Sequence, residues 1–398
     1  MKLTAIYHLP FTIYHYFMLY LDNNATTQIA PEVFEAMKPF LQEFYGNPSS
    51  AYNFGRDTRN TIETSRKKVA ELLGAASGDE VIFTSGGTES NNWAIFGTLE
   101  TIPHKKHIVT TQVEHEAVRK VCDKLEKQDY EITRIGVSEQ GFLDLDELKY
   151  SLRADTAIVS VMLANNETGI LFPVAKIAEV VKADSDAIFH VDGVNAVGKI
   201  PVDLKSTAID LFSISGHKFH APKGIGALYI KRGVELPSLS IGGGQEKGRR
   251  AGTEAVHQIA ALGAAAELVM DFSAMNKISI LRDRLENEIL QKIPNSRLNG
   301  TNDARFRLPN TSNISFPNLN GETILAKLND AGICVSTGSA CNAETHTASA
   351  VLQAMNIPYS DAMGAIRFSL GRYNTAEEIG FVLEILPEII EDLQKMSL

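Results

Sequence analysis

The fold class can be inferred from residues 187 to 218, AIFHVDGVNAVGKIPVDLKSTAIDLFSISGHK. This stretch holds two apolar runs, 187–192 and 211–215, which we interpret as buried β-strands. The first run ends at Asp192, and the second is followed by Gly216, His217 and Lys218. Open α/β sheets bind their ligands at the carboxyl ends of strands. The sequence therefore predicts that Asp192 and Lys218 face one pocket.

On both sides of this stretch, from about residue 81 to residue 231, β-rich runs alternate with runs of helical periodicity. This alternation predicts repeated βα units around a largely parallel sheet. The expected strands are Val81–Thr84, Ile108–Val113, Ala157–Ala164, Ala187–Asp192, Leu211–Ser215 and Gly226–Ile230. Helices are expected over Glu116–Gln128 and from Pro173 through Val181.

After about residue 275 the pattern changes to long helices with isolated strands. Those strands are expected at Asn313–Phe316, Cys334–Ser336 and Ala365–Leu370, before a closing helix from Thr375. We therefore predict a large α/β domain over residues 19–275, whose first 15 or so residues pack on the second domain. Residues 276–398 would form this smaller α+β domain.

Residues 1–18 do not fit either domain. The segment is apolar, but Pro10 interrupts it and no small-residue cleavage site follows. Met18 directly precedes the well-patterned Leu19-Tyr20-Leu21-Asp22. We expect residues 1–18 to be an N-terminal extension outside the native protein.

Composition bounds the class of protein. A net charge of −10 with scattered basic residues argues against nucleic acid as a partner. No apolar run reaches the length of a membrane-spanning helix. Three cysteines without a CxxC pair argue against a disulfide framework and against a metal site. We expect a cytoplasmic protein that binds no metal, nucleic acid or membrane.

Three motifs together indicate pyridoxal 5'-phosphate. Gly87 and Thr88 follow a strand and open a helix, which suits a phosphate, although a simple turn gives the same pattern. Asp192 can pair with a ring nitrogen or cap its turn, and Lys218 can form a Schiff base or be solvated. His115 can cover a ring or cap a helix. Phosphate cradle, carboxylate and lysine are the three anchors that this cofactor requires.

The cysteines differ in their surroundings. Cys122 lies on an apolar helical face and Cys334 lies in a predicted strand, so both are expected to be buried. Cys341 follows Ser336-Thr337-Gly338-Ser339-Ala340 and precedes another polar run. Such a loop leaves a thiol exposed. Cys341 is therefore the candidate nucleophile.

From Tyr20 to about residue 380 the chain resembles the group I cysteine desulfurases of the NifS/IscS type, in the class V aminotransferase family. The matching pieces are YLDNNATT at 20–27, GNPSS at 46–50, FTSGGTESNN at 83–92, VEHEAV at 113–118, NNETG at 165–169, HVDGVNAVGK at 190–199, SGHKFHAPKGIGALY at 215–229, RRAGT at 249–253, TGSAC at 337–341 and IRFSLGR at 366–372. The resemblance implies a fold-type I pyridoxal-phosphate transferase, with a mostly parallel seven-stranded sheet flanked by helices.

The resemblance also implies roles. Lys218 would hold the cofactor aldehyde, Asp192 its ring nitrogen, and His115 would stack on the ring and move protons. The other cofactor-binding residues would be Gly87, Thr88, Asn166, Asn195, Ser215, His217 and Thr253. Asn195 stands where the family usually has glutamine. Thr253 would reach the phosphate of the neighbouring subunit, which requires a homodimer.

Asn166 and Arg367 would bind the carboxylate of L-cysteine. Cys341 would take the sulfur as a persulfide, leaving L-alanine. The acceptor would be an iron–sulfur scaffold protein or another sulfur acceptor, and IPYSDAMGAIRFSL at 357–370 favours the nitrogen-fixation-type branch. The sequence leaves open a selenocysteine lyase or another class V lyase or aminotransferase, and a non-catalytic sulfur carrier.

Overall fold

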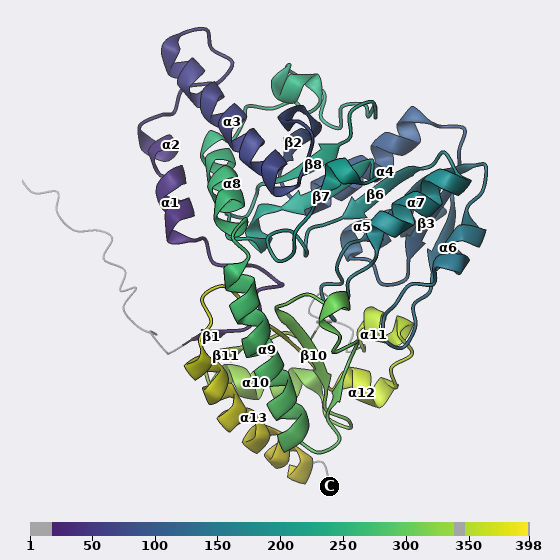
Figure 1. Cartoon of the computed structure of the whole chain (residues 1–398), viewed down its shortest axis with the longest axis vertical. Coiled ribbons are helices and arrows are strands. Elements are labelled where there is room, and N and C mark those ends of the chain that lie inside the picture. The colour runs from purple at the N-terminus through teal and green to yellow at the C-terminus, as the bar shows by residue number, and fades with distance from the viewer. Residues whose placement is uncertain (1–17, 338–346, 397–398) are drawn as a thin grey trace, which may run out of the picture.

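The computed structural model describes residues 18–337 and 347–396. Its upper part in Figure 1 is built around a seven-stranded sheet of order β2-β8-β7-β6-β5-β3-β4. The strands are β2 (Val81–Thr84), β3 (His107–Thr111), β4 (Glu131–Ile135), β5 (Thr156–Met162), β6 (Ile188–Asp192), β7 (Leu211–Ser215) and β8 (Gly226–Ile230). Only β8 runs against its neighbours. The predicted mostly parallel, seven-stranded sheet is confirmed.

Helices cover both faces of this sheet. Val109 and Val159 pack into the core beneath one helical layer, whereas the adjacent Ile108 and Ile158 pack on the other side. Successive strand residues point to opposite faces, so both faces must be apolar. The first layer is α3 (Asn53–Leu72), α6 (Leu145–Ser151), α7 (Val174–Asp184) and α8 (Val256–Val269), and the second is α4 (Gly87–Thr101) and α5 (Glu116–Glu126).

The lower part in Figure 1 is smaller and has its own core. Its antiparallel sheet has the order β12-β10-β9, and a second two-stranded sheet pairs β1 with β11. The strands are β1 (Leu19–Tyr20), β9 (Arg297–Leu298), β10 (Thr311–Ser315), β11 (Ile333–Cys334) and β12 (Ala365–Ser369). The helices are α9 (Ser273–Lys292), α10 (Gly321–Asp330), α11 (Ala350–Ala354), α12 (Tyr359–Met363) and α13 (Ala376–Met396).

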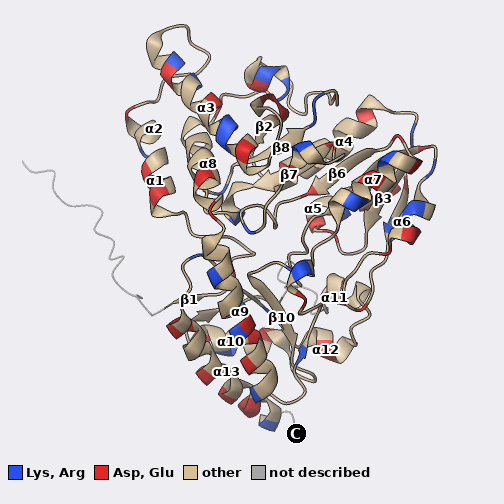
Figure 2. Ribbon diagram, in the orientation of Figure 1, with Lys and Arg blue, Asp and Glu red and all other residues tan. Residues whose placement is uncertain are grey.

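The N-terminal strand lies in this second core, where Leu19 and Leu21 are fully buried among residues of α9, α10 and α13. Residue 275 falls within the first turns of α9. The proposed division of the chain at that residue stays a prediction. Acidic side chains follow one another along α13, and its one basic residue, Lys395, lies in the last turn (Figure 2).

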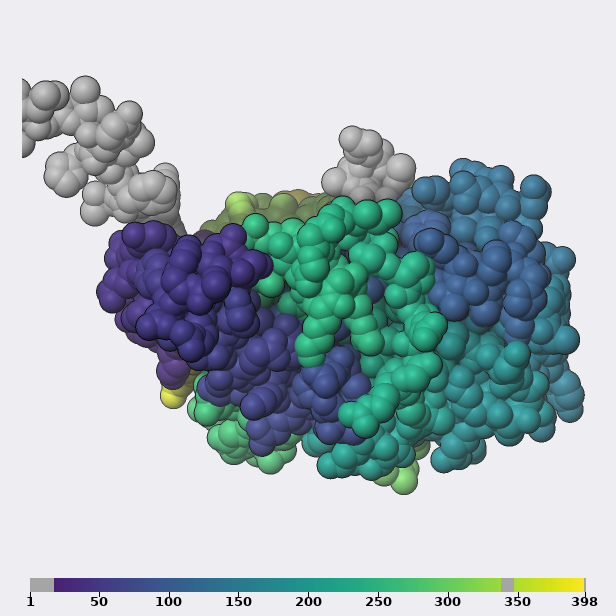
Figure 3. Space-filling view, turned by 90° about the horizontal axis from the view of Figure 1, so that it is seen from above, coloured from purple at the N-terminus to yellow at the C-terminus, as the bar shows by residue number. Residues whose placement is uncertain are grey.

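The segment around residue 250 lies between the N-terminal helices and the residues near 100 (Figure 3). Two ion pairs fasten it there. Arg66 of α3 holds both carboxylate oxygens of Glu246, at 2.7 and 2.8 Å, in a buried pair. Arg250 binds Glu89 in the first turn of α4 at 2.8 Å. The remaining elements are α1 (Pro31–Met37), α2 (Pro39–Gln42) and short 3-10 turns at Gly78–Glu80, Leu204–Ser206, Gly216–Lys218, Gln245–Gly248 and Ala304–Phe306.

Within the described ranges, no single helix is both long and apolar enough to cross a membrane. The helices α8 and α9 reach that length and apolar content only as a pair, bent by 70°.

Candidate active site

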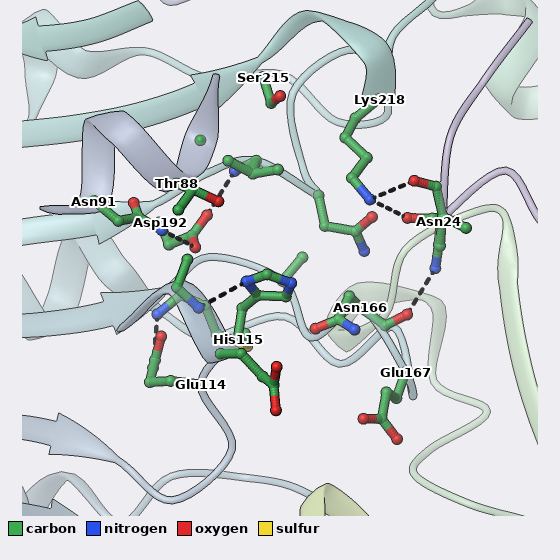
Figure 4. Close-up of a pocket in the computed structure, with 18 of the residues that line it drawn as sticks. Asn24, Thr88, Asn91, Glu114, His115, Asn166, Glu167, Asp192, Ser215 and Lys218 are labelled. Atoms are coloured by element: carbon green, nitrogen blue, oxygen red, sulfur yellow. Dashed lines mark hydrogen bonds between the residues drawn. The ribbon is translucent and has the colours of Figure 1, made fainter. Parts of the chain in front are cut away.

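A pocket of about 740 Å³ opens where the parallel strands end. Its walls come from the segments that follow β2, β3, β5, β6 and β7, and from the smaller sheet through Arg367 of β12. Ten of the predicted site residues line it, namely Gly87, Thr88, His115, Asn166, Asp192, Asn195, Ser215, His217, Lys218 and Arg367. Figure 4 shows how the labelled side chains converge from opposite walls.

Asp192 is the last residue of β6 and is only 5% exposed. One carboxylate oxygen accepts a hydrogen bond from Asn91 Nδ2 at 2.7 Å, and the other accepts from the main-chain N–H of Val194 at 3.0 Å. These two donors stabilise the carboxylate inside a mostly apolar environment. A carboxylate at this place suits the ring nitrogen of a pyridine-type cofactor.

Lys218 lies in the turn that directly follows β7. Its ammonium donates to the main-chain carbonyls of Asn24 and Ala25, the second at 2.9 Å. In Figure 4 it points across the pocket from the wall opposite His115. Two main-chain carbonyl groups therefore help to hold the amine inside the pocket.

His115 both caps a helix and lines the pocket. Its Nδ1 accepts a hydrogen bond from the main-chain N–H of Ala117 at 3.1 Å, at the N-terminus of α5. Because Nδ1 accepts, a neutral imidazole carries its proton on Nε2. The cap fixes the imidazole at the pocket wall, and its stacking on a cofactor ring stays a prediction.

The predicted phosphate cradle is the N-terminus of α4. Gly86 has φ +148°, a backbone conformation that favours glycine, and a Cβ on Gly87 would lie 2.6 Å from Val194 Cγ2. Burial and then the nearby Lys218 lower the pKa of His217 to about 4, so its imidazole is neutral. A helix N-terminus with a neutral imidazole and close backbone approach suits a phosphate.

Arg367 crosses from the smaller sheet into the pocket. Its guanidinium donates to Asp22 at 2.6 Å and to the main-chain carbonyl of Asn166 at 3.1 Å. Its Nε–H is buried without a partner among the described residues. An orphaned donor beside the pocket is a group that a ligand carboxylate can satisfy.

The model of the Aminotransferase class-V family matches residues 19–382. The chain belongs to this family. A cysteine desulfurase of Trichormus azollae is 53% identical over 382 residues, 96% of this chain and 94% of that protein. The cysteine desulfurase NifS of Azotobacter vinelandii is 46% identical over 381 residues, 95% of this chain and 94% of that protein. The solved structure of a NifS-like protein superposes with a TM-score of 0.88 at 37% identity, covering 94% of this chain and all of that one.

Membership of the class V aminotransferases implies dependence on pyridoxal phosphate. The residues fit that cofactor, because the cradle at Gly87, the buried carboxylate of Asp192 and the amine of Lys218 are brought into one pocket. These are the groups that its phosphate, ring nitrogen and aldehyde require.

The other two predicted residues are Thr253 and Cys341. Thr253 is exposed and does not line the pocket. Cys341 lies outside the described residues. The other two cysteines are poor nucleophiles, since burial raises the pKa of Cys122 to about 12 and raises that of Cys334.

The structure adds pocket residues to which the sequence reasoning gave no role, namely Asp22, Asn24, Asn91, Glu114 and Glu167. Burial raises the pKa of Glu114 to about 8 and that of Glu167 to about 7. Glu167 accepts a hydrogen bond from Ser349. All five stand within the matching motifs, but most of their hydrogen-bond partners lie far away in the chain, so the spacing of residues gave no signal.

Proposed function

We propose that this class V enzyme is a cysteine desulfurase, which removes sulfur from L-cysteine and releases L-alanine. The observation that carries the proposal is the convergence of Lys218, Asp192 and Arg367 on one pocket, in a chain about half identical to cysteine desulfurases. Bound pyridoxal phosphate supplies an aldehyde for the substrate amine and an electron sink for the bond-breaking steps.

The protein groups do the positioning and the proton transfer. Arg367, with its orphaned Nε–H, and Asn166 bind the substrate carboxylate. The carboxylate of Asp192 would hold the ring nitrogen of the cofactor and stabilise positive charge there. Lys218 takes the proton from the substrate Cα. His115, whose Nδ1 is occupied by the helix cap, delivers a proton on the way to alanine.

Cys341 accepts the sulfur atom of the substrate. Its thiolate attacks the substrate sulfur, an S–S bond forms, and the carbon–sulfur electron pair passes to the carbon side. Two protons then complete the methyl group and Cα of alanine. Cys341 retains the sulfur as a persulfide until an acceptor takes it.

The wider assignments belong to the same proposal. The protein would act as a cytoplasmic homodimer in which Thr253 completes the phosphate site of the neighbouring subunit. Its acceptor would be an iron–sulfur scaffold protein, including one that serves nitrogenase, or another sulfur acceptor. The 46% sequence identity to the NifS of Azotobacter vinelandii supports the nitrogen-fixation-type assignment.

The decisive experiment replaces the thiol. Cys341→Ala should abolish persulfide transfer and sulfide release from L-cysteine while leaving the absorption band of the bound cofactor intact. Cys334→Ala is the matched control and should keep its activity, because that thiol lies in β11 with a raised pKa. Sulfide release that persists at the wild-type rate in Cys341→Ala would contradict the proposal. L-selenocysteine and a keto acid, tested in parallel, separate the related lyase and aminotransferase activities.

A further inference from the structure

Lys199 is a buried cationic group that the mechanism above does not use. It is 6% exposed, and its Nζ donates to Asn24 Oδ1 at 2.9 Å, to Asn195 Oδ1 at 2.8 Å and to the Asn195 carbonyl at 2.9 Å. All three acceptors are neutral. Burial, and then the cations Lys218 and Arg367, hold the pKa of Lys199 well below the usual range.

Burying an ammonium that has no carboxylate partner costs free energy of folding. The presence of Lys199 at this place therefore calls for an explanation. An ammonium at this place has three N–H groups and donates one to each of the three oxygens, so both side-chain amides must face it with their oxygens. Lys199 must face the oxygen of both asparagine side chains. The NH2 group of each amide is thereby turned the other way.

For Asn195 the consequence is a donor on the pocket side. Its oxygen is taken by Lys199, and its Nδ2 makes only a long contact of 3.5 Å with the carbonyl of Asn165. Asn195 lines the pocket. Its NH2 group is thus oriented by Lys199 and available to a cofactor oxygen.

For Asn24 the consequence is a link between the two lobes, that is, the part built on the seven-stranded sheet and the smaller part built on β10 and β12. Its Oδ1 also accepts from Asn310 at 3.1 Å, and its Nδ2 donates to the Asn166 carbonyl at 3.1 Å and to Thr311 at 2.9 Å. Its main-chain carbonyl accepts from Lys218 (Figure 4). The side chain that Lys199 fixes therefore holds the segment against which the reactive lysine rests.

We infer that Lys199 is a positioning residue, which fixes the amides of Asn195 and Asn24 so that the first presents its NH2 group to the cofactor and the second seats Lys218. The inference rests on the proposed function, because it assumes that pyridoxal phosphate occupies this pocket. Lys199 touches neither substrate nor cofactor and acts through the two asparagines.

The test measures the affinity of apoprotein for pyridoxal phosphate by titrating the absorption band. Lys199→Met keeps the length of the side chain and removes the donor, and it should weaken binding by about tenfold, as expected for the loss of buried hydrogen-bond partners. Lys176→Met, on the exposed side of α7, is the control and should bind as the wild type does. Wild-type protein that does not bind the cofactor would overturn the proposed function. Unchanged affinity in Lys199→Met would overturn this inference alone.

A double-mutant cycle separates positioning from general structural support. If Lys199 acts through Asn195, adding Lys199→Met to Asn195→Ala should weaken binding by much less than tenfold. Two full, multiplicative losses would contradict the inference. So would a large drop in the unfolding temperature of the Lys199→Met apoprotein with unchanged cofactor affinity.

Lys199→Gln keeps a donor on a shorter, neutral side chain and provides a second variant for the same cycle. It should bind the cofactor with an affinity between those of the wild type and Lys199→Met. If Lys199→Met does not fold, the coupling of Lys199→Gln with Asn195→Ala decides the matter, and independent effects of the two changes would overturn the inference.

Discussion

At the scale of single residues, Glu114 shows how the pocket affects stability. Its carboxyl is fully buried and accepts hydrogen bonds from Thr111 at 2.7 Å and from the main-chain N–H of Met162 at 3.0 Å. Its second oxygen has no partner among the described residues. Burial, with a smaller effect of the nearby Asp192, raises its pKa to about 8. The carboxyl is therefore protonated at neutral pH.

The sign of the resulting pH dependence follows from proton binding. An unfolded Glu114 releases its proton near pH 4.5, whereas the folded protein keeps it to about pH 8. Between these values the folded state binds more protons, so stability falls as the pH rises. Glu114→Gln cannot titrate at this position. The free energy of unfolding of this variant, relative to that of the wild type, should therefore be about 3 kcal/mol higher at pH 8 than at pH 5.

Urea unfolding of the apoprotein at pH 5 and pH 8 measures this difference. Glu139→Gln, at an exposed position, is the control and should leave the pH dependence as it is. Part of the slope should remain in Glu114→Gln, because burial also raises the pKa of Glu167, to about 7. A slope in Glu114→Gln equal to that of the wild type would show that Glu114 is ionised in the folded state.

At the scale of elements, the packing of α3 on α8 depends on Gly263. A Cβ built on this buried residue would lie 2.7 Å from Ser65 Cβ and 2.8 Å from its Cα. The backbone of α3 would have to move. Gly263→Ala should therefore destabilise the protein by about 1–3 kcal/mol, despite the better helix propensity of alanine.

Gly380 in α13 is the matched control, because a Cβ there meets nothing closer than Arg284 Nη2 at 3.8 Å. Gly380→Ala should stabilise the protein by about 0.5–1 kcal/mol through helix propensity alone. Urea midpoints at constant slope measure both changes. If the two substitutions shifted the midpoint in the same direction, close packing at Gly263 would not be the determining factor.

The bounds of a strand could be predicted from the sequence where the run of buried residues ends at the same residue as the hydrogen bonds of the strand. The predicted Val81–Thr84, Leu211–Ser215 and Gly226–Ile230 coincide with β2, β7 and β8. The predicted ends at Val113 and Ala164 were wrong by two residues, since both residues are buried under the pocket after the ladder has stopped. No strand was predicted at β4, which is an edge strand with a half-exposed face and lacks a continuous apolar run.

At the scale of the whole molecule, ten residues of the pocket could be predicted from the sequence, but the contacts that hold them could not. Motifs at strand ends identified Asp192 and Lys218, because parallel strands bring their carboxyl ends together. The contacts of Asn24 join it to Thr311 across 287 residues of chain. Such pairing depends on how the two lobes pack, and no local periodicity encodes it.

In the proposed dimer, each active site would contain Thr253 from the neighbouring subunit. Thr253 is exposed and outside the pocket of its own chain, at the end of the segment that Arg66 and Arg250 fasten. If Thr253 serves the neighbouring site, a heterodimer of a Lys218→Ala subunit with a Thr253→Ala subunit contains one intact site. Its activity at limiting pyridoxal phosphate should be about half that of the wild-type dimer, because closed two-fold symmetry gives two equivalent sites.

The reciprocal heterodimer supplies the control. Pairing a wild-type subunit with one that carries both Lys218→Ala and Thr253→Ala leaves the remaining lysine opposite a missing threonine. This species should have much lower activity than the first heterodimer at limiting cofactor, and should approach it when the cofactor is in excess. Two differently tagged subunits, co-expressed and purified through both tags, give each heterodimer without homodimers. If Thr253 acted within its own chain, the order of the two activities would be reversed.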